Sequence, residues 1–226
     1  MFSAQDPRPA PGSGSFAVPC EDARVIRAVL FDADGVLQGA RPGWKDRLAA
    51  LVPADRADEF VTELFAAELP PLRGESSWPD ELAKVLARWN VAAPLDDVLA
   101  NWNDIVVYPD ELDVVRAVRA AGTGCYLATN QQAYRAAYMR GALGYDEVFD
   151  AEFYSCDLGL AKPDPAYLST ILEAIGVPGR AALFVDDNLL NVEGARTAGL
   201  HAEHFPPASG ASALRELLTR YDVPLN

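Results

Sequence analysis

The sequence predicts an α/β protein, with a doubly wound, mostly parallel Rossmann-like sheet and an inserted α-helical cap. Three observations predict this fold class. After Tyr108, short apolar runs alternate with amphipathic segments, which is typical of βαβ units. Acidic and polar residues directly follow the apolar runs, as they do where the strands of an open sheet end at a ligand site. Residues 43–103, by contrast, show helical patterns without convincing strands, which indicates an inserted module.

The first strand is expected over residues 24–31, and its buried-type run Ala28–Phe31 stops abruptly at Asp32. Residues 1–22 precede it and are rich in Pro, Gly, Ser and Ala, which favours an extended or disordered leader. We therefore divide the chain into that leader, a sheet domain of residues 23–40 and 106–226, and a helical cap of residues 41–105.

Three amphipathic helices are expected in the cap. The clearest has apolar residues at the spacings of one helix face, and Ser77 and Pro79 suit its first turn. The residues on that face are Trp78, Leu82, Val85, Leu86 and Trp89. The other two helices run through Phe60 and through Val98. We expect the aromatic residues of the cap to pack in its core more than against a ligand.

Strands and helices alternate through the rest of the chain. The helix after Tyr108 should stop near Gly122, and Asp164 with Pro165 should begin a later helix. The further elements expected are a strand at residues 125–128, a helix at 131–140, strands at 151–155 and 181–185, a helix at 189–198 and a last strand at 200–205. This order predicts helices on both faces of the sheet.

The charge of the chain excludes some classes of partner. It has 19 basic and 33 acidic residues, a formal net charge of -14, which repels nucleic acid and anionic membranes. No apolar run approaches the roughly 20 residues that span a bilayer, and the N-terminus is not of the secretory type. We therefore expect a cytoplasmic protein, a monomer or weak homodimer, that binds neither nucleic acid nor membrane. Cys20, Cys125 and Cys156 lack metal-ligand spacing and should be reduced thiols.

Chemically matched side chains follow the predicted strands. They are Asp32 and Asp34 after the first strand, Thr129 and Asn130 after the strand at 125–128, Asp186 and Asp187 after the strand at 181–185, and Lys162 in a loop before a helix. Carboxylates gathered in one cleft raise each other's pKa unless a cation lies between them, and Mg2+ prefers such oxygen ligands. If these strands are neighbours, the sequence predicts a Mg2+ site suited to a phosphoryl group.

Asp32 and Asp34 are two residues apart, and Gly35 lets the backbone turn just after them. One carboxylate can attack phosphorus and form an aspartyl phosphate. The neighbouring carboxyl group can protonate the leaving oxygen and later deprotonate a water. Taken alone, Asp-x-Asp-Gly after a strand is often only a turn, so the other strand ends must support this interpretation.

Four segments, in order, resemble the motifs of the haloacid dehalogenase-like hydrolase superfamily. They are Phe31-Asp32-Ala33-Asp34-Gly35-Val36, Leu127-Ala128-Thr129-Asn130, Lys162-Pro163-Asp164-Pro165 and Phe184-Val185-Asp186-Asp187-Asn188. Residues 157–163 and 185–195 look like the branch of sugar-phosphate phosphatases that includes bacterial glucose-1-phosphate phosphatase. The helical insertion after the first motif is similar to the small cap of that branch. Four motifs in order are far more specific than one.

The resemblance implies a role for each of these residues. Asp32 is then the nucleophile, and Asp34 is the general acid and base, with its backbone carbonyl on the metal. Thr129 and Lys162 hold phosphate oxygens, and Asn130 adds a donor. The implied magnesium site consists of Asp32, Asp34, Asp187 in direct contact, and Asp186 acting through water or Lys162. Asn191 stands where many relatives carry a further acid.

These features favour a magnesium-dependent phosphomonoesterase for a small phosphorylated metabolite, with a sugar phosphate among the candidates. A phosphomutase of the same fold and a catalytically silent binding module remain alternatives. Dehalogenation is disfavoured, because a leaving halide needs no proton donor and Asp34 is present. Among residues outside the motifs, Arg41 is the best candidate for a substrate contact, since it lies a few residues beyond Asp32, although a solvated charge is the better interpretation of this residue.

Overall fold

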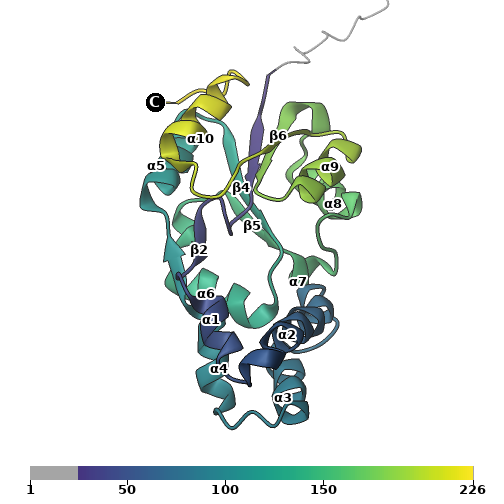
Figure 1. Cartoon of the computed structure of the whole chain (residues 1–226). Coiled ribbons are helices and arrows are strands. Elements are labelled where there is room, and N and C mark those ends of the chain that lie inside the picture. The colour runs from purple at the N-terminus through teal and green to yellow at the C-terminus, as the bar shows by residue number, and fades with distance from the viewer. Residues whose placement is uncertain (1–24, 226) are drawn as a thin grey trace, which may run out of the picture.

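The structure, a computed structural model, describes residues 25–225, so the predicted leader at residues 1–22 lies outside the described part. Five parallel strands form one sheet in the order β5-β4-β1-β6-β7 (Figure 1). The strands are β1 (Ala28–Phe31), β4 (Gly124–Thr129), β5 (Ala151–Tyr154), β6 (Ala182–Asp186) and β7 (His201–His204). The predicted α/β fold class is confirmed.

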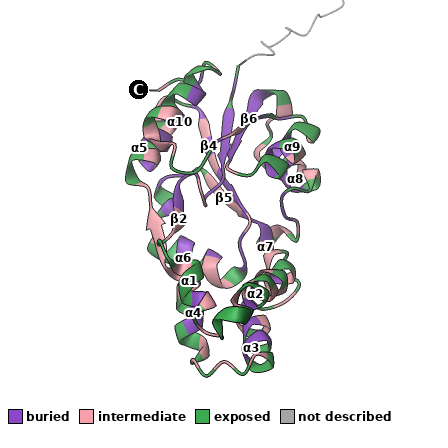
Figure 2. Cartoon of the chain, viewed as in Figure 1, coloured by how far each residue is buried: buried purple, intermediate pink, exposed green. Residues whose placement is uncertain are grey.

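The central strand β1 lies between β4 and β6 and is covered on both faces of the sheet. All of its residues are buried, and its side chains alternate between the two faces, with Val29 and Phe31 in one apolar core and Ala28 and Leu30 in the other. Figure 2 shows buried residues running along the central strands. Phe31 pairs with Leu127 of β4 and with Val185 of β6. The residues that follow these three strands therefore meet at one edge of the sheet.

Helices cover both faces of the sheet. One apolar core contains residues of α5 (Pro109–Ala120), α6 (Ala133–Ala142) and α10 (Gly210–Thr219), and the other contains residues of α8 (Pro165–Ile175) and α9 (Leu189–Thr197). The shorter helical turns are α7 (Ser155–Leu158), η2 (Tyr145–Glu147) and η3 (Gly179–Ala181). The helix α10 was not among the elements expected from the sequence. No described helix is both long and apolar enough to cross a bilayer.

The inserted segment forms a helical cluster with an apolar core of its own. Its elements are α1 (Trp44–Ala49), η1 (Ala54–Arg56), α2 (Ala57–Leu72), α3 (Trp78–Arg88) and α4 (Leu95–Asn103). The rings of Trp78 and Trp102 lie 4.7 Å apart in this core, where Phe60 and Leu82 are fully buried. Ser77 occupies the N-cap position of α3, as expected, but its side chain makes no capping hydrogen bond.

A short antiparallel ribbon joins this helical cluster to the sheet. The chain leaves through β2 (Gln38–Ala40) and returns through β3 (Ile105–Val107), with Gln38 opposite Val107. The sequence analysis did not predict the ribbon, and it placed its domain boundaries at 40/41 and 105/106, so the second boundary falls inside β3. Strands this short carry no readable alternation of polar and apolar residues.

Candidate active site

A cleft of about 540 Å³ lies between the carboxyl edge of the sheet and the helical cluster. The sheet side contributes the predicted residues Asp32, Asp34, Thr129, Asn130, Lys162 and Asp187. The side of the inserted helices contributes Trp44, Phe65, Glu68, Leu72, Asn101 and Trp102. Asp186, the remaining predicted residue, is fully buried and contacts Lys162. The fold thus brings all the predicted site residues together.

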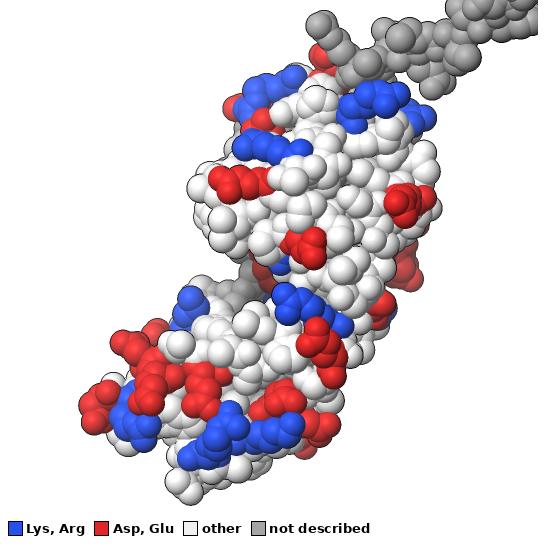
Figure 3. Space-filling view, turned by 90° about the vertical axis from the view of Figure 1, so that its right-hand side faces the viewer, with Lys and Arg blue, Asp and Glu red and all other residues white. Residues whose placement is uncertain are grey.

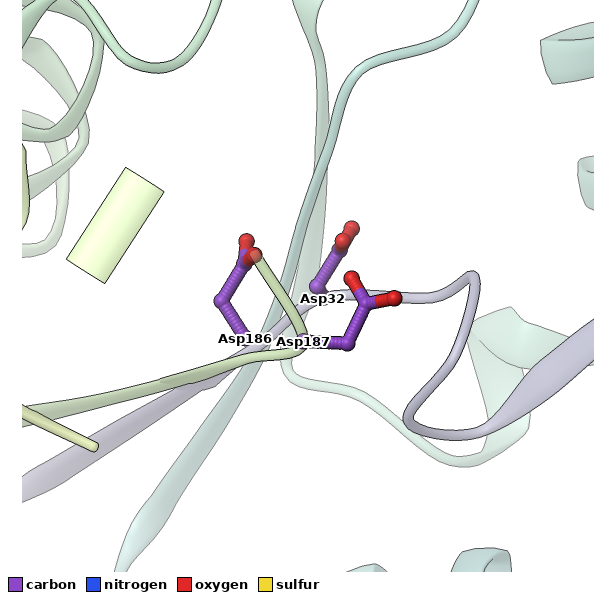
Figure 4. A group of neighbouring side chains, drawn as sticks. All are labelled: Asp32, Asp186 and Asp187. Atoms are coloured by element: carbon purple, nitrogen blue, oxygen red, sulfur yellow. The ribbon is translucent and has the colours of Figure 1, made fainter. Parts of the chain in front are cut away.

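Three of the carboxylates form a compact acidic group. Asp32, Asp186 and Asp187 each offer an oxygen, and these oxygens all lie within 4.8 Å of one another (Figure 4). Burial raises the pKa of Asp32 to about 7, and the negative charges of Asp186 and Asp34 act in the same direction, while Lys162 opposes them. Burial and the neighbouring Asp186 also raise the pKa of Asp187. Such a group is short of positive charge, which a divalent cation would supply.

Lys162 provides the positive charge that the protein itself places in this group. Its buried ammonium group lies 2.7 Å from Asp186 Oδ2 and 2.8 Å from Asp32 Oδ1, and it also donates to the carbonyl oxygen of Ala128 at 2.9 Å. A lysine ammonium has three protons, so these contacts account for all of them. In this arrangement the Lys162 ammonium group has no proton left to donate to a ligand.

The two acids at the end of β6 differ in their surroundings. Asp186 accepts hydrogen bonds from Lys162, from the backbone N–H of Asn188 and from the side chain of Asn191. Asp187 is half-buried, faces the cleft and lies against Gly35. Asp187 is therefore the more available oxygen ligand. Asn191 donates to both carboxylate oxygens of Asp186.

Thr129 ends β4, and Asn130 follows it beside this group. The Thr129 hydroxyl accepts a hydrogen bond from Gln131 Nε2 at 3.2 Å. The Asn130 side chain donates to the carbonyl oxygen of Lys162 and accepts from its backbone N–H, each at 2.9 Å. The Asn130 amide therefore holds the Lys162 loop, and its own backbone N–H is the donor that it can offer to a ligand.

Asp34 is held by donors that the sequence analysis largely missed. Arg135 of α6 donates from two nitrogens, one to each carboxylate oxygen of Asp34, at 2.8 and 2.9 Å. Gln131 donates to Oδ2 at 2.8 Å, and Gln38 donates to Oδ1 at 3.2 Å. Arg41 is exposed and pairs with Asp104, which agrees with its interpretation as a solvated surface charge. Arg135 lies six residues after Thr129 and belongs to none of the four motifs, so the sequence did not indicate that it would bind Asp34.

Glu68 of α2 is the other residue that the sequence analysis missed. It lines the cleft and accepts a hydrogen bond from Trp102 Nε1 at 2.8 Å. Burial raises the pKa of Glu68 to about 7, with the nearby Arg135 opposing and Asp34 adding to the shift. In the sequence it resembles any other acid on an amphipathic helix.

Comparison with known proteins identifies the family. A family model described as haloacid dehalogenase-like hydrolase matches residues 26–199. The chain is 30% identical to a phosphoglycolate phosphatase of Pseudomonas putida over 194 residues, 77% of this chain and 67% of that protein. It is equally identical to a phosphoglycolate phosphatase of Rhodospirillum rubrum over 193 residues, 77% of each chain.

Solved structures share the fold. A HAD family enzyme of Bacteroides thetaiotaomicron, solved in complex with magnesium and inorganic phosphate, aligns with a TM-score of 0.73 at 19% identity, over 84% of this chain and 98% of that chain. The L-2-haloacid dehalogenase of Xanthobacter autotrophicus aligns with a TM-score of 0.61 at 22% identity, over 86% and 83% of the two chains. With the family model and the phosphatase relatives, these findings show that the chain belongs to the haloacid dehalogenase-like hydrolase family.

Proposed function

We propose that this protein is a magnesium-dependent phosphomonoesterase that acts on a small phosphorylated metabolite through an aspartyl-phosphate intermediate on Asp32. The observation that carries the proposal is the group of Asp32, Asp186 and Asp187 carboxylates within 4.8 Å of one another, beside the buried Lys162. The phosphatase relatives support the same reaction class. A sugar phosphate is one candidate substrate, as the resemblance to sugar-phosphate phosphatases suggests.

The residues present fit a magnesium ion. The raised pKa values of Asp32 and Asp187 reflect acids buried with too little positive charge around them. We assign Asp32 and Asp187 as direct ligands, the backbone carbonyl of Asp34 as a further one, and Asp186 as a supporting acid held by Lys162. When bound, the ion supplies positive charge that neutralises the transferring phosphoryl group.

The reaction takes place in two displacements. A carboxylate oxygen of Asp32 attacks phosphorus, the bond from phosphorus to the leaving oxygen breaks, and Asp34 gives that oxygen a proton. Asp34 then takes a proton from a water, whose oxygen attacks the phosphorus and releases Asp32 and inorganic phosphate. Thr129 and the backbone N–H of Asn130 bind the phosphate oxygens at the start of the loop before α6.

We also propose that the helical cluster of α1 to α4 is a cap, corresponding to residues 41–105. Its side chains Trp44, Phe65 and Trp102 cover the cleft opposite Asp32. A cap in this place excludes water during phosphoryl transfer and contacts the leaving group, so it selects the substrate.

Hydrolysis of a chromogenic phosphomonoester in the presence of Mg2+ tests this function. We expect phosphate release by the wild type, and a loss of at least ~100-fold in Asp32→Asn, because an amide is not a competent nucleophile. Asp113→Asn is a matched control, since Asp113 is exposed on α5 and its ion pair within the described part of the chain is with Arg116. A chelator should abolish activity and added Mg2+ should restore it. Activity in Asp32→Asn equal to that of the wild type would overturn the proposal.

A further inference from the structure

We infer, on the basis of the proposed phosphatase function, that the leaving group of the substrate carries no negative charge, and that Glu68 of the helical cluster discriminates against one that does. The part of the cleft concerned lies beyond the phosphoryl group, where none of the four sequence motifs contributes a residue. The substrate class is then a phosphate ester of an uncharged carbon skeleton that bears hydroxyl groups.

The cations of the cleft are already paired with acids of the sheet domain. Among the described residues that line it, only Arg135 and Lys162 carry a positive charge. Arg135 donates from two nitrogens to Asp34, and Lys162 pairs with Asp32 and Asp186. A carboxylate or second phosphate on the leaving group would therefore enter a cleft that has no unpaired cation for it, and an unpaired charge in such a place is costly.

The side of the cleft formed by the inserted helices is aromatic and acidic. Phe65, Glu68 and Leu72 line it at spacings of three and four residues, which places them on one face of α2. Trp44 lies beside Phe65, with the two ring centroids 5.7 Å apart. These rings offer an apolar surface that the C–H groups of a carbon chain or ring can cover. Among the described residues of the four inserted helices, Glu68 is the only charged one that lines the cleft.

Glu68 is held in place by a neutral donor. Trp102 Nε1 donates to Oε1 of Glu68 at 2.8 Å, and the Trp102 ring packs against Trp78 in the core of the helical cluster. No ion pair within residues 25–225 includes Glu68. Its Oε2 can therefore accept a hydrogen bond from a hydroxyl of the leaving group, whereas its charge repels an anionic group at the same place.

Asp104 also lines the cleft, but two arginines neutralise it. Arg41 and Arg47 each donate to one of its carboxylate oxygens at 2.7 Å. Both arginines are exposed, and neither lines the cleft. Their positive charge is thus bound to Asp104 at the surface and does not balance Glu68.

Pairs of esters that differ in the charge of the leaving group provide the test. In 2-hydroxyethyl phosphate a hydroxymethyl group stands where 2-phosphoglycolate has a carboxylate, and glycerol 3-phosphate and 3-phosphoglycerate differ in the same way. At pH 8, above the pKa of Glu68, we expect kcat/KM to favour the uncharged member of each pair by about 10-fold or more. Inhibition of the hydrolysis of a chromogenic ester ranks any member that is turned over slowly.

Glu68→Gln tests the discriminating residue. Glutamine keeps an oxygen for Trp102 and for a hydroxyl group but removes the charge, so the preference should fall to about threefold or less, through better use of the charged member. The ratio compares two esters on one preparation and does not depend on the fraction of folded protein. Glu59→Gln is the matched control and should keep the wild-type ratio, since Glu59 is exposed on the same helix and pairs with Arg56.

The chromogenic ester separates the two levels of failure. If the wild type releases no phosphate from it, the proposed function fails and the leaving-group preference fails with it. If the wild type hydrolyses it but uses or binds the charged member of each pair at least as well as the uncharged one, the preference is overturned and the phosphatase function stands. A full preference retained in Glu68→Gln would overturn the role of Glu68.

Discussion

Gly35 is the smallest residue of the site and one of the most constrained. Its φ of 81° lies in the region that side chains rarely adopt, and a Cβ added to it would collide with the carboxylate of Asp187. The same glycine allows the chain to turn after Asp34 and allows Asp187 to lie close to Asp32. Gly194 likewise allows a close approach, here between helix α9 and the loop that carries Lys162. A Cβ at Gly194 would collide with the carbonyl oxygen of Pro163 and displace that loop.

Gly35→Ala should therefore damage the site more than the fold. The added methyl group displaces Asp187 and strains the turn, so we expect a loss of Mg2+-dependent phosphatase activity of about 10-fold or more, with a cost in stability of about 1–2 kcal/mol. Activity at increasing Mg2+ and thermal unfolding measure the two effects. Gly141→Ala is the control, because nothing lies within 4 Å of the added Cβ in helix α6. Equal activity in Gly35→Ala and wild type would contradict the close packing of Gly35 on Asp187.

At the level of elements, the sequence predicted the site residues that stand at the carboxyl ends of strands, because a polar residue after an apolar run marks such a position. Thr129 and Asp186 end strands, and Asp32 directly follows one, and each of these strands is visible as an apolar run, so their convergence followed once the sheet was assumed. Arg135 and Glu68 were missed because their roles depend on the directions in which two helices point their side chains across the cleft. The β2–β3 ribbon was missed because three-residue strands leave no pattern.

Helix α2 carries a charge into the cleft that should make stability depend on pH. Its Glu68 has a pKa raised from 4.5 to about 7 by burial. Between those values the folded protein holds a proton that the unfolded chain releases, so the free energy of unfolding falls as pH rises through this window. At pH 8 the buried Glu68 costs roughly 2–3 kcal/mol relative to pH 5, and this figure already includes the attraction of Arg135. Arg135, Asp34, Trp102 and Gln132 are the charged and polar groups that act on Glu68.

Glu68→Gln should remove that dependence. Urea unfolding at pH 5 and pH 8 should show that the variant gains stability over wild type at pH 8 and gains little at pH 5. Glu59→Gln is the matched control on the same helix, because Glu59 is exposed at the surface. If the difference between Glu68→Gln and wild type is the same at both pH values, the native Glu68 does not retain its proton in this range.

At the level of the whole molecule, the negative net charge of the chain and the buried carboxylates of the site both add charge repulsion to the folded state. The chain carries a formal net charge of -14, and Figure 3 shows acidic and basic side chains mixed over the helical cluster at the lower end of the molecule. Such a net charge opposes the compact state by self-repulsion. Self-repulsion also acts among the buried acids at the sheet edge, where only Lys162 among the described residues pairs with both Asp32 and Asp186.

Magnesium should therefore stabilise the whole fold through this one site. A ligand at about 100 times its Kd adds about 2.7 kcal/mol, which for a chain of this size raises Tm by about 5–10 °C. Salt alone also screens the net charge, so the comparison must be made against NaCl of equal ionic strength. We expect Mg2+ to raise Tm beyond NaCl in the wild type and in Asp113→Asn, and not in Asp187→Asn. The same rise in Tm with Mg2+ and with NaCl would show screening of surface charge in place of a specific metal site.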